Sequence, residues 1–131
     1  MGFRFEFDSV NKILLARFEG RFTDESVADC YRAIRRYSTA TDARAGIFDL
    51  SPVTEFPVST EFIRQLARQE PAMADPTRPR VIVVPQTHAF GLARMFQIIG
   101  EPTRPLLKVV HTLDEAFATL GVQSPHFEPM E

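Results

Sequence analysis

The sequence predicts one α/β domain, built on a mostly parallel sheet with one antiparallel edge strand and about four helices. Two stretches typical of strands open the chain, and helical patterns then alternate with short apolar stretches. This alternation is typical of parallel strands joined by right-handed crossovers. The chain has 131 residues, of which 44% are hydrophobic and 24% charged, as expected for one folded domain.

An N-terminal β-hairpin is predicted by the first twenty residues. Phe3, Phe5 and Phe7 alternate with charged residues, and a period of two is typical of a half-buried strand. Turn-forming residues follow at 8–11, and residues 12–19 have the composition of a second strand.

Four helices are predicted from their capping residues and apolar stripes. Their ranges are 24–38, 60–70, 88–99 and 113–120. Thr23 and Ser59 stand at the N-cap positions of the first two helices. Thr112 and Glu115 form a capping box before the fourth helix, and Gly121 is expected to end it.

Three further strands are predicted between these helices, at 44–50, 81–84 and 106–110. Residues 81–84 read VIVV, and a continuous apolar run favours a central strand that is covered on both faces. The complete order is therefore ββαβαβαβα.

We assign residues 1–122 to this single domain and expect 123–131 to form a loosely ordered tail. Two Thr-Arg-Pro triplets, at 77–79 and 103–105, precede the last two strands. We interpret them as a recurring loop structure and not as a functional repeat.

The composition argues against several classes of function. The net charge is −2 and the isoelectric point is near 5.9, so we expect no attraction to nucleic acid. No apolar stretch is long enough to insert into a membrane. Cys30 is the only cysteine, which excludes an intrachain disulfide and favours a soluble protein in the reducing cytoplasm.

Motifs of catalysis and metal binding are missing from the sequence. His88, His111 and His126 have no ligand spacing, and no serine lies in a nucleophile elbow. The six glycines are scattered and form no phosphate-binding loop. Cys30 falls on the apolar stripe of the first helix, so we expect it to pack in the core. We expect no metal, no cofactor and no enzymatic activity.

One short segment resembles a known family. Residues 49–54 read DLSPVT at the end of a predicted strand and lead to Ser59 at a helix start. This arrangement is similar to the anti-sigma-factor-antagonist region of STAS domains, where D-L-S-x-V precedes a D-S-S-G turn. In that family the second serine caps a helix and is phosphorylated by a partner kinase. The order of elements also resembles the SpoIIAA-like group, which is related to STAS and SEC14 domains.

The resemblance implies a STAS-like fold and a switch turn in which Ser59 is the phospho-acceptor, together with Asp49, Ser51 and Thr60. A phosphate at a helix N-terminus would meet free backbone N–H groups. Pro57, Val58 and Thr60 stand where the family has Asp, Ser and Gly. The alternative is that Ser59 acts only as an N-cap.

Polar residues follow the predicted central strands, at the edge where open parallel sheets bind ligands. A small-molecule or catalytic site at this edge would use Gln86, Thr87, His88 and His111, with Asp49 nearby. The alternative is that Thr87 caps a helix and that the other residues lie in solvated loops.

The predicted helix 88–99 has two apolar faces. One face is expected to dock on the sheet, and Phe90, Arg94 and Ile98 fall on the opposite side. We expect this second face to contact another subunit in a homodimer, a regulatory partner or an apolar ligand.

Three functions follow from these observations. The leading hypothesis is a non-enzymatic regulatory or protein-interaction module of STAS type. The first alternative is a small carrier or sensor of an apolar ligand, which the SEC14-like side of the resemblance and the 12 Phe residues suggest. The second alternative is a small enzyme built on Asp49, His88 and His111 at the strand ends.

Overall fold

A computed structural model describes residues 2–130 of the chain. Its main sheet consists of β1 (Phe3–Asp8), β2 (Ile13–Phe18), β4 (Ala45–Asp49), β6 (Arg80–Val83), β7 (Leu107–Val110) and β8 (Glu128–Pro129). A second sheet of two short strands pairs β3 (Gly20–Arg21) with β5 (Val53–Glu55). The helices are α1 (Asp24–Thr41), α2 (Thr60–Arg68), α3 (Thr87–Gly100) and α4 (Leu113–Leu120).

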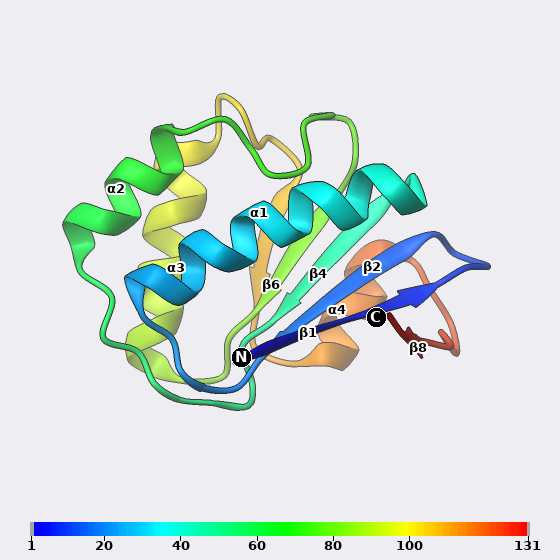
Figure 1. Ribbon diagram of the computed structural model, residues 1–131, viewed down its shortest axis with the longest axis horizontal. Coiled ribbons are helices and arrows are strands. Elements are labelled where there is room, and N and C mark those ends of the chain that lie inside the picture. The colour runs from blue at the N-terminus through cyan, green and yellow to red at the C-terminus, as the bar shows by residue number, and fades with distance from the viewer. Residues whose placement is uncertain (1, 131) are drawn as a thin grey trace.

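The six strands of the main sheet are ordered β7-β6-β4-β2-β1-β8 (Figure 1). Neighbouring strands from β2 to β7 are parallel, whereas β1 is antiparallel to β2. The predicted α/β class, the N-terminal hairpin and the mostly parallel sheet are therefore confirmed. None of the helices within residues 2–130 is long and apolar enough to cross a membrane.

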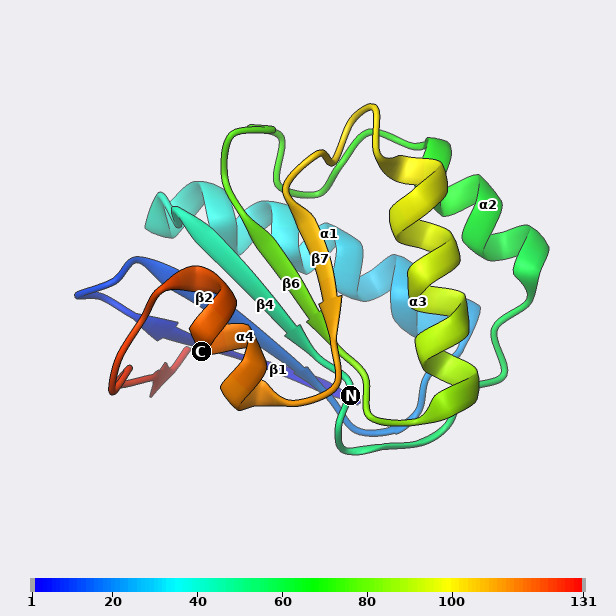
Figure 2. The same ribbon diagram turned by 180° about the vertical axis from the view of Figure 1, so that it is seen from behind.

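The helices cover the two faces of the sheet unequally. The face toward α1, α2 and α3 is visible in Figure 1, and α4 covers the opposite face, which is turned to the viewer in Figure 2. Leu14 of β2 packs toward the three helices, and Leu15 packs toward α4, because successive strand residues point to opposite faces. Ile82 and Val81 of β6 divide in the same way. The central strands are thus buried on both sides.

The caps of three helices confirm the sequence prediction. The Oγ1 of Thr23 accepts from the Ser26 amide at 3.1 Å, and the Oγ of Ser59 accepts from the Phe62 amide at 3.1 Å. Thr112 forms the predicted capping box, and Gly121 ends α4 with φ at +68°.

Three helices differ from their predicted ranges, and α2 ends at Arg68, two residues before the predicted end. Helix α1 continues three residues beyond Ser38, to Thr41, and ends where Asp42 adopts the left-handed conformation. Helix α3 includes Thr87 as its first residue and has no side-chain cap from Gln86, so Thr87 is not a capping residue. Propensity alone gives no stop signal at Ser38, because residues 39–41 are also compatible with a helix.

The C-terminal segment predicted as a loose tail pairs with the sheet. Strand β8 runs antiparallel to β1 and is therefore the edge strand, and the Met130 amide donates to the Phe5 carbonyl at 2.8 Å. The predicted domain and tail also include Met1 and Glu131, which lie outside the described residues. The pairing arises because the outer edge of β1 offers backbone groups that need partners.

Asp8 links the C-terminal segment to the turn of the N-terminal hairpin through hydrogen bonds. Its carboxylate is 1% exposed and accepts hydrogen bonds from the amides of Val10 and Asn11, the Asn11 side chain and the His126 amide. Burial by itself would raise the pKa of Asp8, but these hydrogen bonds outweigh burial and lower the pKa below its usual value. The folded state therefore favours the ionised carboxylate.

We expect Asp8→Asn to lower the free energy of unfolding by about 1–3 kcal/mol at pH 7, because three backbone donors lose a charged acceptor. Since the folded pKa lies below the unfolded one, the contribution of Asp8 is present above the unfolded pKa and disappears as the pH falls through the folded pKa. Urea unfolding at several pH values would measure both effects, with exposed Asp24→Asn as control. A loss that stays equally large below pH 3 would contradict this account.

Candidate functional site

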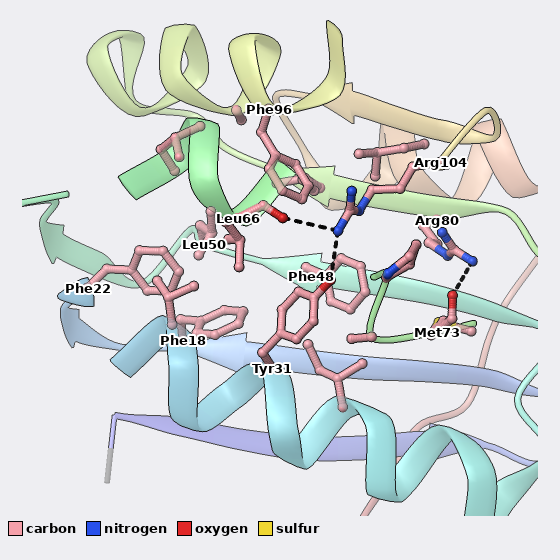
Figure 3. Close-up of a pocket in the computed structure, with 18 of the residues that line it drawn as sticks. Phe18, Phe22, Tyr31, Phe48, Leu50, Leu66, Met73, Arg80, Phe96 and Arg104 are labelled. Carbon is pink, nitrogen blue, oxygen red and sulfur yellow. Dashed lines mark hydrogen bonds between the residues drawn. The ribbon is translucent and has the colours of Figure 1, made fainter. Parts of the chain in front are cut away.

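An apolar cavity of about 120 Å³ lies between the main sheet and helices α1, α2 and α3 (Figure 3). Side chains from these three helices, from the sheet and from the loop before β6 line it. The lining includes Phe18, Phe22, Tyr31, Arg80, Ala93 and Arg104. No aspartate or glutamate is among the described residues that line the cavity.

Aromatic rings form one end of the cavity. Phe18 is the last residue of β2, and Phe22 lies two residues before α1, where it packs beside Val27 as part of the helix start. The rings of Phe18 and Phe22 meet edge to face, with centroids 4.9 Å apart. Phe56 stacks on the other side of Phe22 at 5.0 Å. These contacts hold the rings in place at this end of the cavity.

Arg104 lies at the other end and is only 4% exposed. Its guanidinium donates to the carbonyls of Ala67, Leu66 and Gln69 at 2.7, 3.3 and 3.1 Å. These carbonyls belong to the C-terminal end of α2, which carries partial negative charge, and that of Leu66 also accepts from the Gln69 amide at 3.1 Å. The guanidinium carbon also lies 4.8 Å from the centre of the Phe96 ring of α3.

Tyr31 connects Arg104 to the first helix. Its hydroxyl accepts from Nη2 of Arg104 at 2.7 Å and donates to the Glu70 carbonyl at 2.6 Å. Tyr31 belongs to α1, so one hydroxyl joins this helix to the segment that follows α2. The Tyr31 hydroxyl and both Nη atoms of Arg104 thus have hydrogen-bond partners within the protein.

Arg80, the first residue of β6, is likewise 4% exposed. Its Nη2 donates to the carbonyls of Met73 and Asp75 at 2.5 and 2.6 Å and so fixes the loop before β6. The Nε atom is buried and has no hydrogen-bond partner among residues 2–130. Burial lowers the pKa of Arg80, and the positive charge of Arg104 lowers it further.

Neither buried arginine has a carboxylate partner. The ion pairs formed within residues 2–130 involve surface or partly exposed arginines and His126, and none includes Arg80 or Arg104. Backbone carbonyls and one hydroxyl are the acceptors that the protein supplies to them. The cavity thus combines an apolar body with one positively charged end.

Comparisons of the sequence with known protein families and with curated proteins found no match. The resemblance to STAS domains therefore stays an expectation from residues 49–59 and from the predicted order of elements.

The predicted switch turn has two separate parts in the structure. Asp49 is buried, with Oδ1 accepting from the Ser51 amide at 3.0 Å and Oδ2 lying 3.8 Å from Nε of Arg17. Ser59 is exposed and caps α2, of which Thr60 is the first residue. Within the described chain, no hydrogen bond joins Asp49 or Ser51 to Ser59 or Thr60.

The polar residues predicted at the strand ends do not form a hydrogen-bonded cluster. Gln86 donates to the carbonyls of Leu50 and Val53 at 3.3 and 2.9 Å and thereby ties two loops together. Thr87 and His88 are exposed at the start of α3, and the His111 ring stacks on Phe90 with centroids 4.1 Å apart.

Within residues 2–130, no hydrogen bond or ion pair links Asp49, His88 and His111. No group of three His, Cys, Asp or Glu side chains in this part of the chain is arranged to hold a metal ion. Cys30 is 1% exposed in the core, as predicted, and burial raises the pKa of its thiol.

The predicted contact face of α3 is only partly exposed. Ile98 is 64% exposed, and the exposed Arg94 donates to Oε1 of Gln97 at 2.9 Å. Phe90 is half-buried, because it packs against the core and stacks on His111. The homodimer expected from this face stays a prediction.

Arg80, Arg104 and Tyr31 line the cavity but were not among the predicted site residues. Arginine is mostly exposed in proteins, so its burial depends on contacts between segments distant in the chain. A weak signal was present in the second Thr-Arg-Pro triplet, 103–105, which includes Arg104.

We expect Arg104→Met to lower the free energy of unfolding by about 2–4 kcal/mol, because it leaves the α2 carbonyls and the Tyr31 hydroxyl without their donor. Arg94→Met makes the same replacement on the surface of α3 and should change this free energy by less than about 0.5 kcal/mol. Chemical denaturation of both variants would measure the difference. Equal losses in the two variants would show that the Arg104 network does not stabilise the fold.

Proposed function

We propose that this protein is a small carrier or sensor that binds an apolar ligand in the cavity between its sheet and helices α1, α2 and α3. The observation that carries the proposal is the cavity itself, which has a volume of about 120 Å³ and a lining rich in aromatic and aliphatic side chains. An engineered apolar cavity of about 150 Å³ stays dry and binds benzene. A ring or a short hydrocarbon chain is therefore the size of group that this cavity accommodates.

The lining of this partly open cavity leaves apolar surface without packing partners. Protein interiors are otherwise packed as closely as organic crystals. A bound apolar ligand would cover this surface and remove it from water, which supports a binding role for the cavity.

The residues around the cavity also provide a route for a ligand to enter. Pro71, Ala72 and Met73 line it, and they belong to the loop between α2 and β6. Loops rearrange more readily than packed helices or strands. The hydrogen bonds from Arg80 to Met73 and Asp75 anchor this loop to the start of β6.

Ala93→Leu tests the cavity as the binding site. Ala93 lines the cavity from α3 and is 7% exposed, so a larger side chain there would fill the space. We expect the wild-type protein to bind toluene, and the variant to bind it at least about tenfold more weakly without loss of stability. Chemical-shift titration and thermal unfolding would provide the two measurements.

Gly91→Leu is the matched control, since it adds the same side chain to α3 at a site where a new Cβ meets no atom within 4 Å. This variant should bind toluene like the wild type. If toluene perturbs no resonance of the wild-type cavity residues, the cavity does not bind a neutral aromatic ligand.

As a second candidate, we propose the regulatory module of STAS type, with Ser59 as its modified residue. The observation in favour is that Ser59 is exposed and directly precedes α2, so that a kinase can reach its hydroxyl. A phosphate at this position would be stabilised by the amides of the first helical turn. Helix α2 also lines the cavity through Ile63 and Leu66, so modification at its start could alter ligand binding.

Ser59→Asn separates phosphorylation from helix capping. Asparagine caps helices as well as serine does but cannot accept a phosphate, whereas Ser59→Ala loses both properties and about 1 kcal/mol of stability. We expect intact-mass measurement of protein from its native cells to show a phosphoform that both variants lack. Wild-type protein without a phosphoform, and with the same partners as Ser59→Asn, would eliminate the switch.

A further inference from the structure

The two ends of the cavity differ in chemistry as well as in position. Phe18 is the last residue of β2, and Arg80 is the first residue of β6. Because β2, β4 and β6 are parallel, these two residues lie toward opposite ends of the strands. Figure 3 shows the rings of Phe18 and Phe22 at one side of the cavity and the guanidinium groups of Arg80 and Arg104 at the other. A ligand that spans the cavity therefore meets an apolar end and a cationic end.

The cationic end is incompletely neutralised by the protein. A buried charge is stable only when opposite charge or well-placed hydrogen bonds compensate it. Arg104 is compensated by the C-terminal carbonyls of α2 and by the Tyr31 hydroxyl. Arg80 donates to two backbone carbonyls, both from the same nitrogen, Nη2, and the Asp75 carboxylate acts on it through charge without forming an ion pair.

Arg80 carries the clearest sign of a missing partner. Its Nε has essentially no access to solvent, so only a group inside the protein can accept its hydrogen. Such an unsatisfied buried donor costs about 1–3 kcal/mol. Burial, and then the charge of Arg104, lower the pKa of Arg80, although the charges of Tyr31 and Asp75 act in the opposite direction.

We propose that the cavity binds an anionic amphiphile, namely a carboxylate on a small ring or short chain, with the carboxylate beside Arg80 and Arg104 and the apolar part toward Phe18 and Phe22. The inference rests on the proposed function, since it takes this cavity as the binding site. A carboxylate at this end supplies negative charge beside the two guanidinium groups that border the cavity. The guanidinium plane suits the planar carboxylate group.

The size of the cavity favours a carboxylate over a phosphate ester. About 120 Å³ accommodates a group near the size of benzene, which leaves little room for a tetrahedral head group. A phosphate monoester also carries between about 1.5 and 2 negative charges at pH 7, and its desolvation in an apolar cavity is correspondingly unfavourable.

The test compares a carboxylate with a neutral amide of nearly the same size and shape. Isothermal titration of the wild-type protein with hexanoate and with hexanamide, at pH 7, would measure the contribution of the carboxylate. We expect hexanoate to bind at least about tenfold more tightly, as a charge-assisted hydrogen bond would produce. Phenyl phosphate serves as the third ligand and should bind more weakly than hexanoate.

Arg80→Met should remove most of the preference for hexanoate while leaving the affinity for hexanamide within about threefold. Arg78→Met is the matched control, because Arg78 lies two residues away and contacts Asp42 and the Ala43 carbonyl, outside the cavity. This control should keep the full preference for hexanoate. An Arg80→Met protein that fails to fold leaves the wild-type comparison of ligands as the deciding measurement.

The possible outcomes distinguish the two proposals. Equal affinities of wild-type protein for hexanoate and hexanamide would overturn the anionic ligand but leave the apolar carrier intact. Tighter binding of phenyl phosphate than of hexanoate would replace the carboxylate by a phosphate ester. If neither these ligands nor toluene bind, the proposed function itself fails.

Discussion

The guanidinium of Arg104 is the interaction on which the arrangement of three helices depends. It joins Tyr31 of α1, the carbonyl end of α2 and the Phe96 ring of α3 through one planar group. Hydrophobic packing alone would draw these helices together wherever apolar surface meets. Directional hydrogen bonds to several elements fix their separation, and the cavity beside Arg104 is the space that this separation leaves.

The two Thr-Arg-Pro triplets use their arginines in a similar way. Arg78 binds the Ala43 carbonyl and Asp42 just after α1, and Arg104 binds the carbonyls at the end of α2. In each case the arginine precedes a strand and secures the end of an earlier helix. The interpretation as a recurring loop structure agrees with these contacts, with the difference that only Arg104 is buried.

The success of sequence-based prediction followed the range of the interactions involved. The hairpin and the caps at Thr23, Ser59 and Thr112 were predictable, because their signals lie within a few residues. Strand β8 has two residues and forms only because β1 offers it an edge, so no local pattern marks it. The cavity could not be predicted for the same reason. Arg80 and Arg104 have the sequence character of surface residues, and they are buried only because distant segments of the chain enclose them.

The short strand β8 also affects how the protein behaves among its neighbours in a concentrated solution. An open strand edge can pair with another chain and start aggregation. Here β8 occupies part of the outer edge of β1, while the opposite edge strand, β7, has four residues and an exposed Lys108. Short edges and lysine both oppose the addition of a foreign strand. Opening of the His126–Met130 segment would therefore expose the outer edge of β1 as a template for sheet growth.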